Sequence, residues 1–152
     1  MPVKIENDRQ LREALNGLLR ESQRQLGARF VASVSHLCSN PIIARGIEVA
    51  TTTEHTAEDL DNAYRNAKKL ALERYTSCGQ DADWAIQAEH FVAAALAACL
   101  LPEEQFSSKD NPAWKAAMQA RMARNCEMIL NDNGEVDGES NRQYAITEAY
   151  LV

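Results

Sequence analysis

One apolar stretch, Trp84 to Leu101, constrains the fold of this chain more than any other feature. Only three polar residues interrupt it, Gln87, Glu89 and His90, so a helix formed here would avoid water on nearly every side. Its longest uninterrupted part covers 11 residues, whereas a helix needs roughly 20 apolar residues to cross a bilayer. We therefore expect a soluble protein, not a membrane protein, in which a helix over about residues 81–101 is buried at the centre.

Length and composition allow one self-sufficient domain over residues 1–152. With 45% hydrophobic and 25% charged residues, such a chain can bury a stable core without disulfides or a structural metal. The N-terminus carries charges where an export signal would be apolar, so we expect a cytoplasmic protein with reduced cysteines.

The charge balance argues against nucleic acid as a partner. The formal net charge is −6, whereas phosphate contacts need a concentrated basic surface. Acidic residues also interrupt the arginines that could build such a surface, which are Arg9, Arg12, Arg20, Arg24 and Arg29.

Helical spacing of apolar residues predicts that the first part of the chain packs around the central helix. Asp8 is expected to cap a helical region that extends to residue 38, with a break or kink near Gly27. Asn40 followed by Pro41 predicts the start of a short helix. Residues 47–53 are also compatible with a strand, but a lone strand would have no partner, so helix is preferred.

Start signals recur in the rest of the chain. Thr56 and Asp59 have the spacing of a capping box, Asp81 is expected to cap the central helix, and Asn111 with Pro112 predicts the start of a last long helix. We expect a mobile acidic loop over 131–141 and a short segment over 142–152 that docks on the bundle. The predicted fold is all-α, a single-domain bundle of five to six helices.

The four cysteines are predicted to be buried and chemically inert. They lie on four different helical segments and none belongs to a CxxC pair, which argues against a zinc site. Two pairs, Cys78 with Cys126 and Cys38 with Cys99, could still share an end of the bundle and carry redox or metal chemistry.

His90 and Gln87 are the candidate residues of a ligand pocket. Neighbouring alanines leave room beside His90, and an imidazole suits ligand binding or proton transfer near neutral pH. The alternative is a structural histidine that is hydrogen-bonded within a closed core, because an unpaired buried polar group costs roughly 1 to 3 kcal/mol. The first interpretation predicts a cavity beside His90.

One face of the last long helix is the candidate interaction surface. Tryptophan and arginine are common at binding hot spots, and methionine adapts to irregular partners. Core packing is the alternative, in which Arg121 should reach solvent or meet a carboxylate. The face comprises Trp114, Met118, Arg121, Met122 and Asn125.

Known catalytic patterns are absent from the sequence. GxGxxG, GxxxxGK[ST], HExxH and GxSxG do not occur, and Tyr144 stands where a calcium loop would need its bidentate carboxylate. We therefore expect no metal and no cofactor, and no enzyme activity is evident. The favoured hypothesis is a cytoplasmic helical adaptor or regulatory protein that binds a protein partner or self-associates. The alternative is a small enzyme or ligand-binding protein with a pocket beside His90, in which a cysteine could take part.

Overall fold

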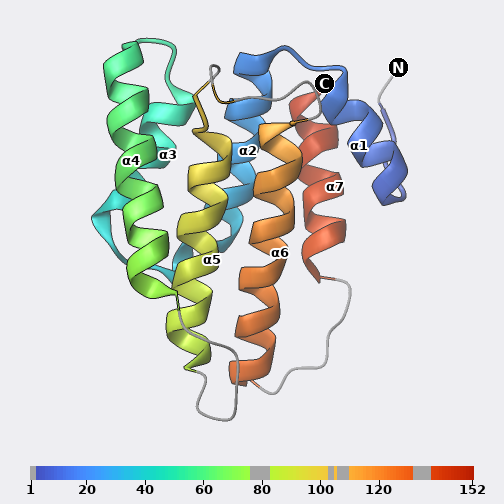
Figure 1. Ribbon diagram of the computed structural model, residues 1–152. Coiled ribbons are helices and arrows are strands. Elements are labelled where there is room, and N and C mark those ends of the chain that lie inside the picture. Colours follow the sequence, from blue (N-terminus) through green and yellow to red (C-terminus); the bar gives the residue numbers. More distant parts are fainter. Residues whose placement is uncertain (1–2, 76–82, 103–104, 106–109, 132–137) are drawn as a thin grey trace.

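Seven α-helices and a short 3₁₀ helix occur in the residues that the computed structural model describes, which are 3–75, 83–102, 105, 110–131 and 138–152 (Figure 1). In chain order they are α1 (Asp8–Asn16), α2 (Arg20–Val34), η1 (Ser35–Leu37), α3 (Pro41–Thr51), α4 (Ala57–Arg74), α5 (Trp84–Cys99), α6 (Pro112–Asn131) and α7 (Gly138–Tyr150). The all-α, single-domain prediction is confirmed. The helices outnumber the predicted five to six because the first helical region contains two of them, α1 and α2.

Helix α5 occupies the centre of the molecule, as predicted. It lies between α4 and α6, with α2 and α3 behind it, and contacts all four (Figure 1). Its inward side is buried from Gln87 to Cys99, whereas Ala94, Ala97 and Ala98 are only partly buried. None of the described helices, α5 included, has the length and apolarity needed to span a lipid bilayer.

The start of α3 is confirmed. The Asn40 side chain accepts a hydrogen bond from the backbone N–H of Ile42 at 3.0 Å, and Pro41 occupies the first helical position, where its missing N–H is not needed. The alternative of a strand over 47–53 is wrong, because α3 continues to Thr51.

The starts of α4 and α6 are also confirmed. At α4, the backbone N–H of Asp59 donates to Thr56 Oγ1 at 3.0 Å, and the backbone N–H of Thr56 donates to Asp59 Oδ2 at 3.1 Å, which completes a capping box. At α6, Pro112 is the first residue, and the backbone N–H of Trp114 donates to Asn111 Oδ1 at 3.1 Å.

The cap of α5 is Asp83, not Asp81. Its Oδ1 accepts hydrogen bonds from the backbone N–H groups of Ala85 and Ile86, at 3.1 and 3.2 Å. Asp81 itself lies outside the described residues. The two aspartates are equally suitable by residue type, so sequence alone does not distinguish them.

The first helical region divides between Gly17 and Leu19, and the predicted break near Gly27 is wrong. Helix α1 ends just before Gly17, which is its C-cap residue, and the backbone of Leu19 is extended before α2 begins. Asp8 is also not the cap of α1. That role belongs to Asn7, whose side chain accepts a hydrogen bond from the third backbone N–H that follows.

Gly27 lies inside α2 at a close approach to α5 and α6. A Cβ atom added at this position would lie 2.9 Å from the Cβ of Cys99 and 3.4 Å from the Cα of Ala113. The glycine therefore allows close helix packing rather than a break. Small side chains also allow close packing on the buried side of α6. They are Ala113, Ala116, Ala117, Ala120, Ala123 and Cys126.

Helix α7 includes the end of the segment predicted to be a mobile loop. Of the range 131–141, Asn131 ends α6, residues 132–137 lie outside the described residues, and Gly138 begins α7. The helix docks against α2, α6 and α1, so the C-terminal segment is longer than the predicted 142–152.

Candidate functional site

An open apolar groove follows the outer side of α5, between α4 and α6. Its volume is about 620 Å³. The groove exists because the side chains of α5 that face outward here are alanines, which leave space between the longer side chains of the two flanking helices. Its lining residues on α4 include Tyr64, Lys68 and Leu72, those on α5 are Ala94, Ala97 and Ala98, and those on α6 include Trp114, Lys115, Met118 and Gln119.

The walls of the groove combine exposed apolar side chains with two ammonium groups. Leu72 is 70% exposed, unusually open for a leucine. Lys68 Nζ lies 5.8 Å from the centre of the Tyr64 ring on the same helix. On the opposite wall, Lys115 Nζ forms an ion pair with Asp110 Oδ1 at 2.7 Å. The groove is therefore apolar along its floor and carries cationic groups on both sides.

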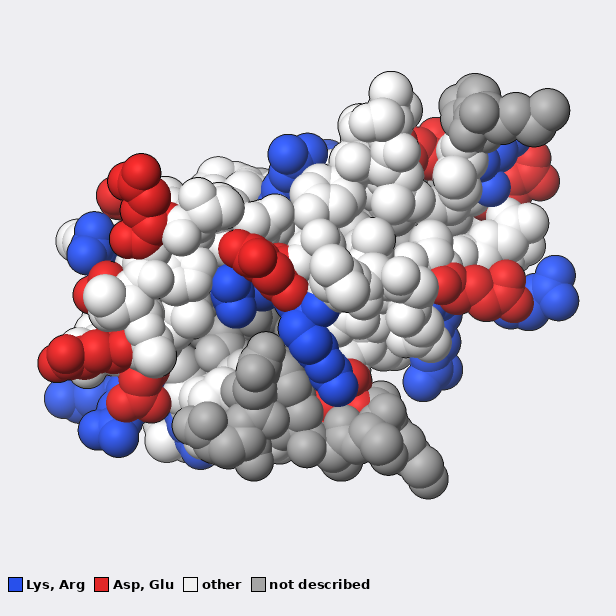
Figure 2. Space-filling view, turned by 90° about the horizontal axis from the view of Figure 1, so that it is seen from above, with Lys and Arg blue, Asp and Glu red and all other residues white. Residues whose placement is uncertain are grey.

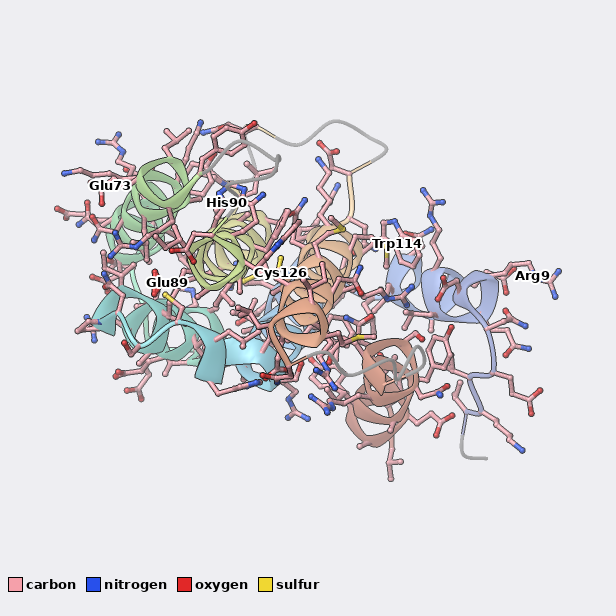
Figure 3. The ribbon with its side chains drawn as sticks, turned by 90° about the horizontal axis from the view of Figure 1, so that it is seen from below. Arg9, Glu73, Glu89, His90, Trp114 and Cys126 are labelled. Atoms are coloured by element: carbon pink, nitrogen blue, oxygen red, sulfur yellow. The ribbon has the colours of Figure 1, made fainter. Side chains whose placement is uncertain are left out.

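The residues of the predicted interaction face do not all point the same way. Trp114 and Met118 are half-buried and line the groove, while Met122, 44% exposed, and Asn125 continue the outer surface of α6. Figure 3 shows Trp114 on the side of α6 that faces α1. Arg121 instead points to α1 and α7 and is engaged by side chains there, as described in the Discussion.

His90 lies in the contact between α4 and α5 (Figure 3). Its Nδ1 donates a hydrogen bond to the backbone carbonyl of Ala71 at 2.6 Å, since a carbonyl can only accept. Its ring also meets the rings of Tyr75 and Phe91 edge-on, at centroid distances of 5.5 and 5.0 Å. Gln87 is buried one turn earlier.

Neither His90 nor Gln87 lines the groove or two other cavities of the described structure. One of these two is the end cavity described next, and the other, of about 430 Å³, surrounds the start of α3. The contacts that the structure describes thus resemble those of a structural histidine, which was the alternative to a ligand pocket at this position.

The end cavity lies where α4 and α6 begin and α5 ends, and sequence reasoning missed it. Its volume is about 660 Å³. The residues come from four separate segments of the sequence, so no local pattern could have indicated it. They are Arg20, Arg24, His55, Ala57, Glu58, Leu60, Asp61, Cys99, Leu100, Leu101, Pro102 and Pro112.

Comparison with protein-family models, curated proteins and solved structures finds no match. Function is therefore inferred from geometry and chemistry alone. Within the described part of the chain, no group of three or more histidine, cysteine, aspartate or glutamate side chains could hold a metal ion. The groove and the end cavity can each receive another molecule.

The three described cysteines, Cys38, Cys99 and Cys126, are buried. Burial raises the pKa of the Cys99 thiol to about 12, and burial is also the main cause that raises the pKa of Cys38. Cys38 lies within the electrostatic reach of Glu89, near the start of α5, whereas Cys99 is at its end, about 15 Å further along at 1.5 Å of rise per residue. Cys78, proposed to pair with Cys126, lies outside the described residues.

Proposed function

We propose that this protein is a cytoplasmic helical interaction domain that binds an amphipathic helix of a partner protein in the groove between α4, α5 and α6. The observation that carries the proposal is an apolar groove that stays open to solvent in an otherwise well-packed bundle. Exposed apolar surfaces of this kind mark sites of association more often than scattered single residues do. The free thiols of Cys38 and Cys99 are consistent with a reducing compartment.

The dimensions of the groove suit a short helical segment. Its α4 wall extends from Tyr64 to Leu72, a rise of about 12 Å, which corresponds to roughly two helical turns. A partner helix would present apolar anchors at positions i, i+4 and i+7. Met122 and Ile129, 44% and 51% exposed, extend the apolar surface along α6. They would help the contact approach the roughly 1,000 Å² expected of a specific interface.

The charges on the walls favour a partner helix with acidic residues beside its apolar stripe. Lys68 stands on the α4 wall and Lys115, which is ion-paired with Asp110, on the α6 wall, so the flank of the bound helix that faces Lys68 would carry the stronger preference for a carboxylate. A second copy of this chain is the less favourable occupant. A symmetric dimer would bring the same lysines of both copies into one interface, and each copy carries a net charge of −6.

A selection from a displayed library of helical peptides tests the proposal. The library has leucine at i, i+4 and i+7 and variable flanking positions. We expect glutamate and aspartate to be enriched at the flanks, and Ala97→Gln, which fills the floor of the groove, to weaken the selected peptides at least about tenfold. Ala85→Gln, on an exposed position of the same helix, is the matched control and should bind normally.

Charge reversal adds a second, independent comparison. Lys68→Glu should weaken acidic peptides by about two- to fivefold, the size expected of an exposed ion pair. Lys69→Glu changes the net charge equally, but its side chain lies about 100° around α4 and outside the groove. Equal effects of the two reversals, or peptides whose binding survives Ala97→Gln, would contradict the proposal. A dimer in solution that Ala97→Gln disrupts would identify a second copy as the occupant.

A further inference from the structure

We infer that the end cavity is a binding site for a small organic carboxylate with an apolar body. This site is separate from the groove and independent of the function proposed for it. The volume of about 660 Å³ lies within the range of small-molecule sites. Its lining combines a continuous set of apolar residues with a guanidinium group, the combination that holds the body and the headgroup of such a ligand. The apolar set comprises Leu60, Leu100, Leu101, Pro102 and Pro112.

Arg24 is the residue that points to an anionic headgroup. Its Nη2 donates to His55 Nε2 at 3.3 Å, but its Nε is buried and has no hydrogen-bond partner. Among the described residues, no carboxylate forms an ion pair with this guanidinium. A buried charged donor without an acceptor is unfavourable, and carboxylate is the group whose geometry best matches guanidinium. A carboxylate in the cavity would supply the missing partner.

His55 leaves this charge available to a ligand. Its Nδ1 lies within hydrogen-bond distance of the backbone carbonyl of Thr52, so Nδ1 carries the proton and Nε2 is the acceptor of the bond from Arg24. In this state the imidazole is neutral. It therefore orients the guanidinium without neutralising it.

The acidic residues of the cavity set the charge of the ligand. Asp61 forms an ion pair with Arg65 Nε at 3.0 Å, and Glu58 is exposed to solvent. In the view from above, basic and acidic side chains alternate around this end of the molecule, with no extended basic surface (Figure 2). The lining thus carries two guanidinium groups, Arg20 and Arg24, and two carboxylates. This balance opposes ligands of high negative charge, such as diphosphates, and favours a monoanion.

Titration with octanoate, followed by calorimetry and by backbone amide NMR shifts, tests the inference. We expect the wild type to bind octanoate at least about tenfold more tightly than its neutral analogue octanamide, because only the carboxylate pairs with Arg24. Arg24→Gln should abolish this preference while octanamide binds as before. Arg9→Gln removes the same charge from an exposed position of α1 that does not line the cavity, and should preserve the preference.

A second variant keeps the test decisive if Arg24→Gln does not fold. Ala57→Phe adds bulk at an exposed position on the cavity wall and leaves the guanidinium in place, so it should weaken octanoate binding at least about tenfold. Ala97→Gln, which blocks the groove, should leave octanoate binding unchanged. Ala97→Gln therefore distinguishes a failure of the groove proposal from a failure of the end-cavity proposal.

Three results would overturn the inference. The first is wild-type protein that does not bind octanoate at millimolar concentration. The second is an undiminished preference for octanoate over octanamide in folded Arg24→Gln. The third is inorganic phosphate that binds as tightly as octanoate or phenyl phosphate, because the apolar lining would then take no part. Tighter binding of octanoate than of phenyl phosphate would support the assignment of a monoanion.

Discussion

The guanidinium of Arg121 in α6 binds the carboxylate of Asp8, the first residue of α1, through two hydrogen bonds of 2.9 and 2.7 Å. The hydroxyl of Tyr144 donates to the same carboxylate at 2.7 Å, and Arg121 Nε donates to Gln143 Oε1 at 2.9 Å. Both of these residues belong to α7. One arginine of α6 therefore connects α7, which follows it in the sequence, with α1, whose Asp8 lies 113 residues before it, and it holds α1 against the rest of the bundle.

This arrangement predicts a pH-dependent contribution to stability from Asp8. The hydrogen bond from Arg121 is the main cause that holds the pKa of Asp8 below its ordinary value, although partial burial opposes the shift. A lowered folded-state pKa means that the contribution is complete above the ordinary pKa near 4 and is lost as the pH falls through the folded-state value. The Asp8 side chain is 49% exposed, so we expect the loss in Asp8→Asn to be below about 1 kcal/mol at pH 7. Urea unfolding of both proteins between pH 7 and pH 2.5 should show this difference shrinking, and a difference independent of pH would contradict it.

Alanine substitutions at two glycines should differ in their cost to stability, because one glycine lies against rigid atoms and the other against a flexible side chain. Gly27→Ala places a Cβ against the Cβ of Cys99 and the backbone of Ala113, neither of which can rotate away, so we expect a loss of about 1 to 3 kcal/mol. The nearest atoms to the new Cβ in Gly46→Ala are Cδ2, Cδ1 and Cγ of Leu96, a side chain that can change rotamer, and alanine also favours the helix by about 1 kcal/mol. Thermal or urea unfolding should therefore find Gly46→Ala the milder change. Equal losses would show that α2 can shift away from α5.

The close contact of Gly27 with α5 and α6 illustrates which parts of the fold could be predicted from the sequence. The starts of α3, α4 and α6 depend on side chains within three residues of the helix end, so Asn40, Thr56 and Asn111 were sufficient to locate them. Gly27 was misinterpreted because its effect depends on residues from two other helices. A glycine that breaks a helix and one that admits a neighbouring helix look identical in a single sequence.

The candidate sites show the same limit. The periodicity of α6 identified a face with Trp114 and Met118, but not that the alanines on the other side would be the buried ones. The partner of Arg121 and the cavity beside Arg24 could not be found in advance, since both combine residues that only the folded chain brings together. Local sequence patterns thus predicted individual helices, whereas the groove and the end cavity form only where several helices pack together.

The buried thiols should resist alkylation until the protein unfolds. Burial raises the pKa of Cys99 to about 12, so its reactive thiolate is scarce at pH 8, and Cys38 and Cys126 are also enclosed. A brief iodoacetamide pulse followed by peptide mass spectrometry should label these three positions only in denaturant. Rapid labelling of Cys99 in the native state would show that the end cavity opens to its base.

Gln143 should be the most sensitive polar residue of the C-terminal helix. It is fully buried, its Oε1 accepts from Arg121 Nε at 2.9 Å, and its Nε2 donates to the carbonyl of Ala117 at 2.9 Å. Leucine has a similar volume but can make neither bond, so Gln143→Leu would leave a charged donor without its buried acceptor. We expect a loss of about 2 to 3 kcal/mol in urea unfolding at pH 7.

A double-mutant cycle distinguishes that loss from a change in packing. Arg121→Met keeps the aliphatic stem and removes the donor, so Gln143→Leu made in that background should cost less by about 1 kcal/mol or more, the coupling expected of directly bonded side chains. A matched control is Thr147→Val, one turn further along α7, whose hydroxyl donates only to the carbonyl of Gln143 within the same helix. Its cost should be the same with and without Arg121. Additive losses for Gln143→Leu and Arg121→Met would mean that the contact between α6 and α7 depends on shape alone, and that the amide of Gln143 has found another partner.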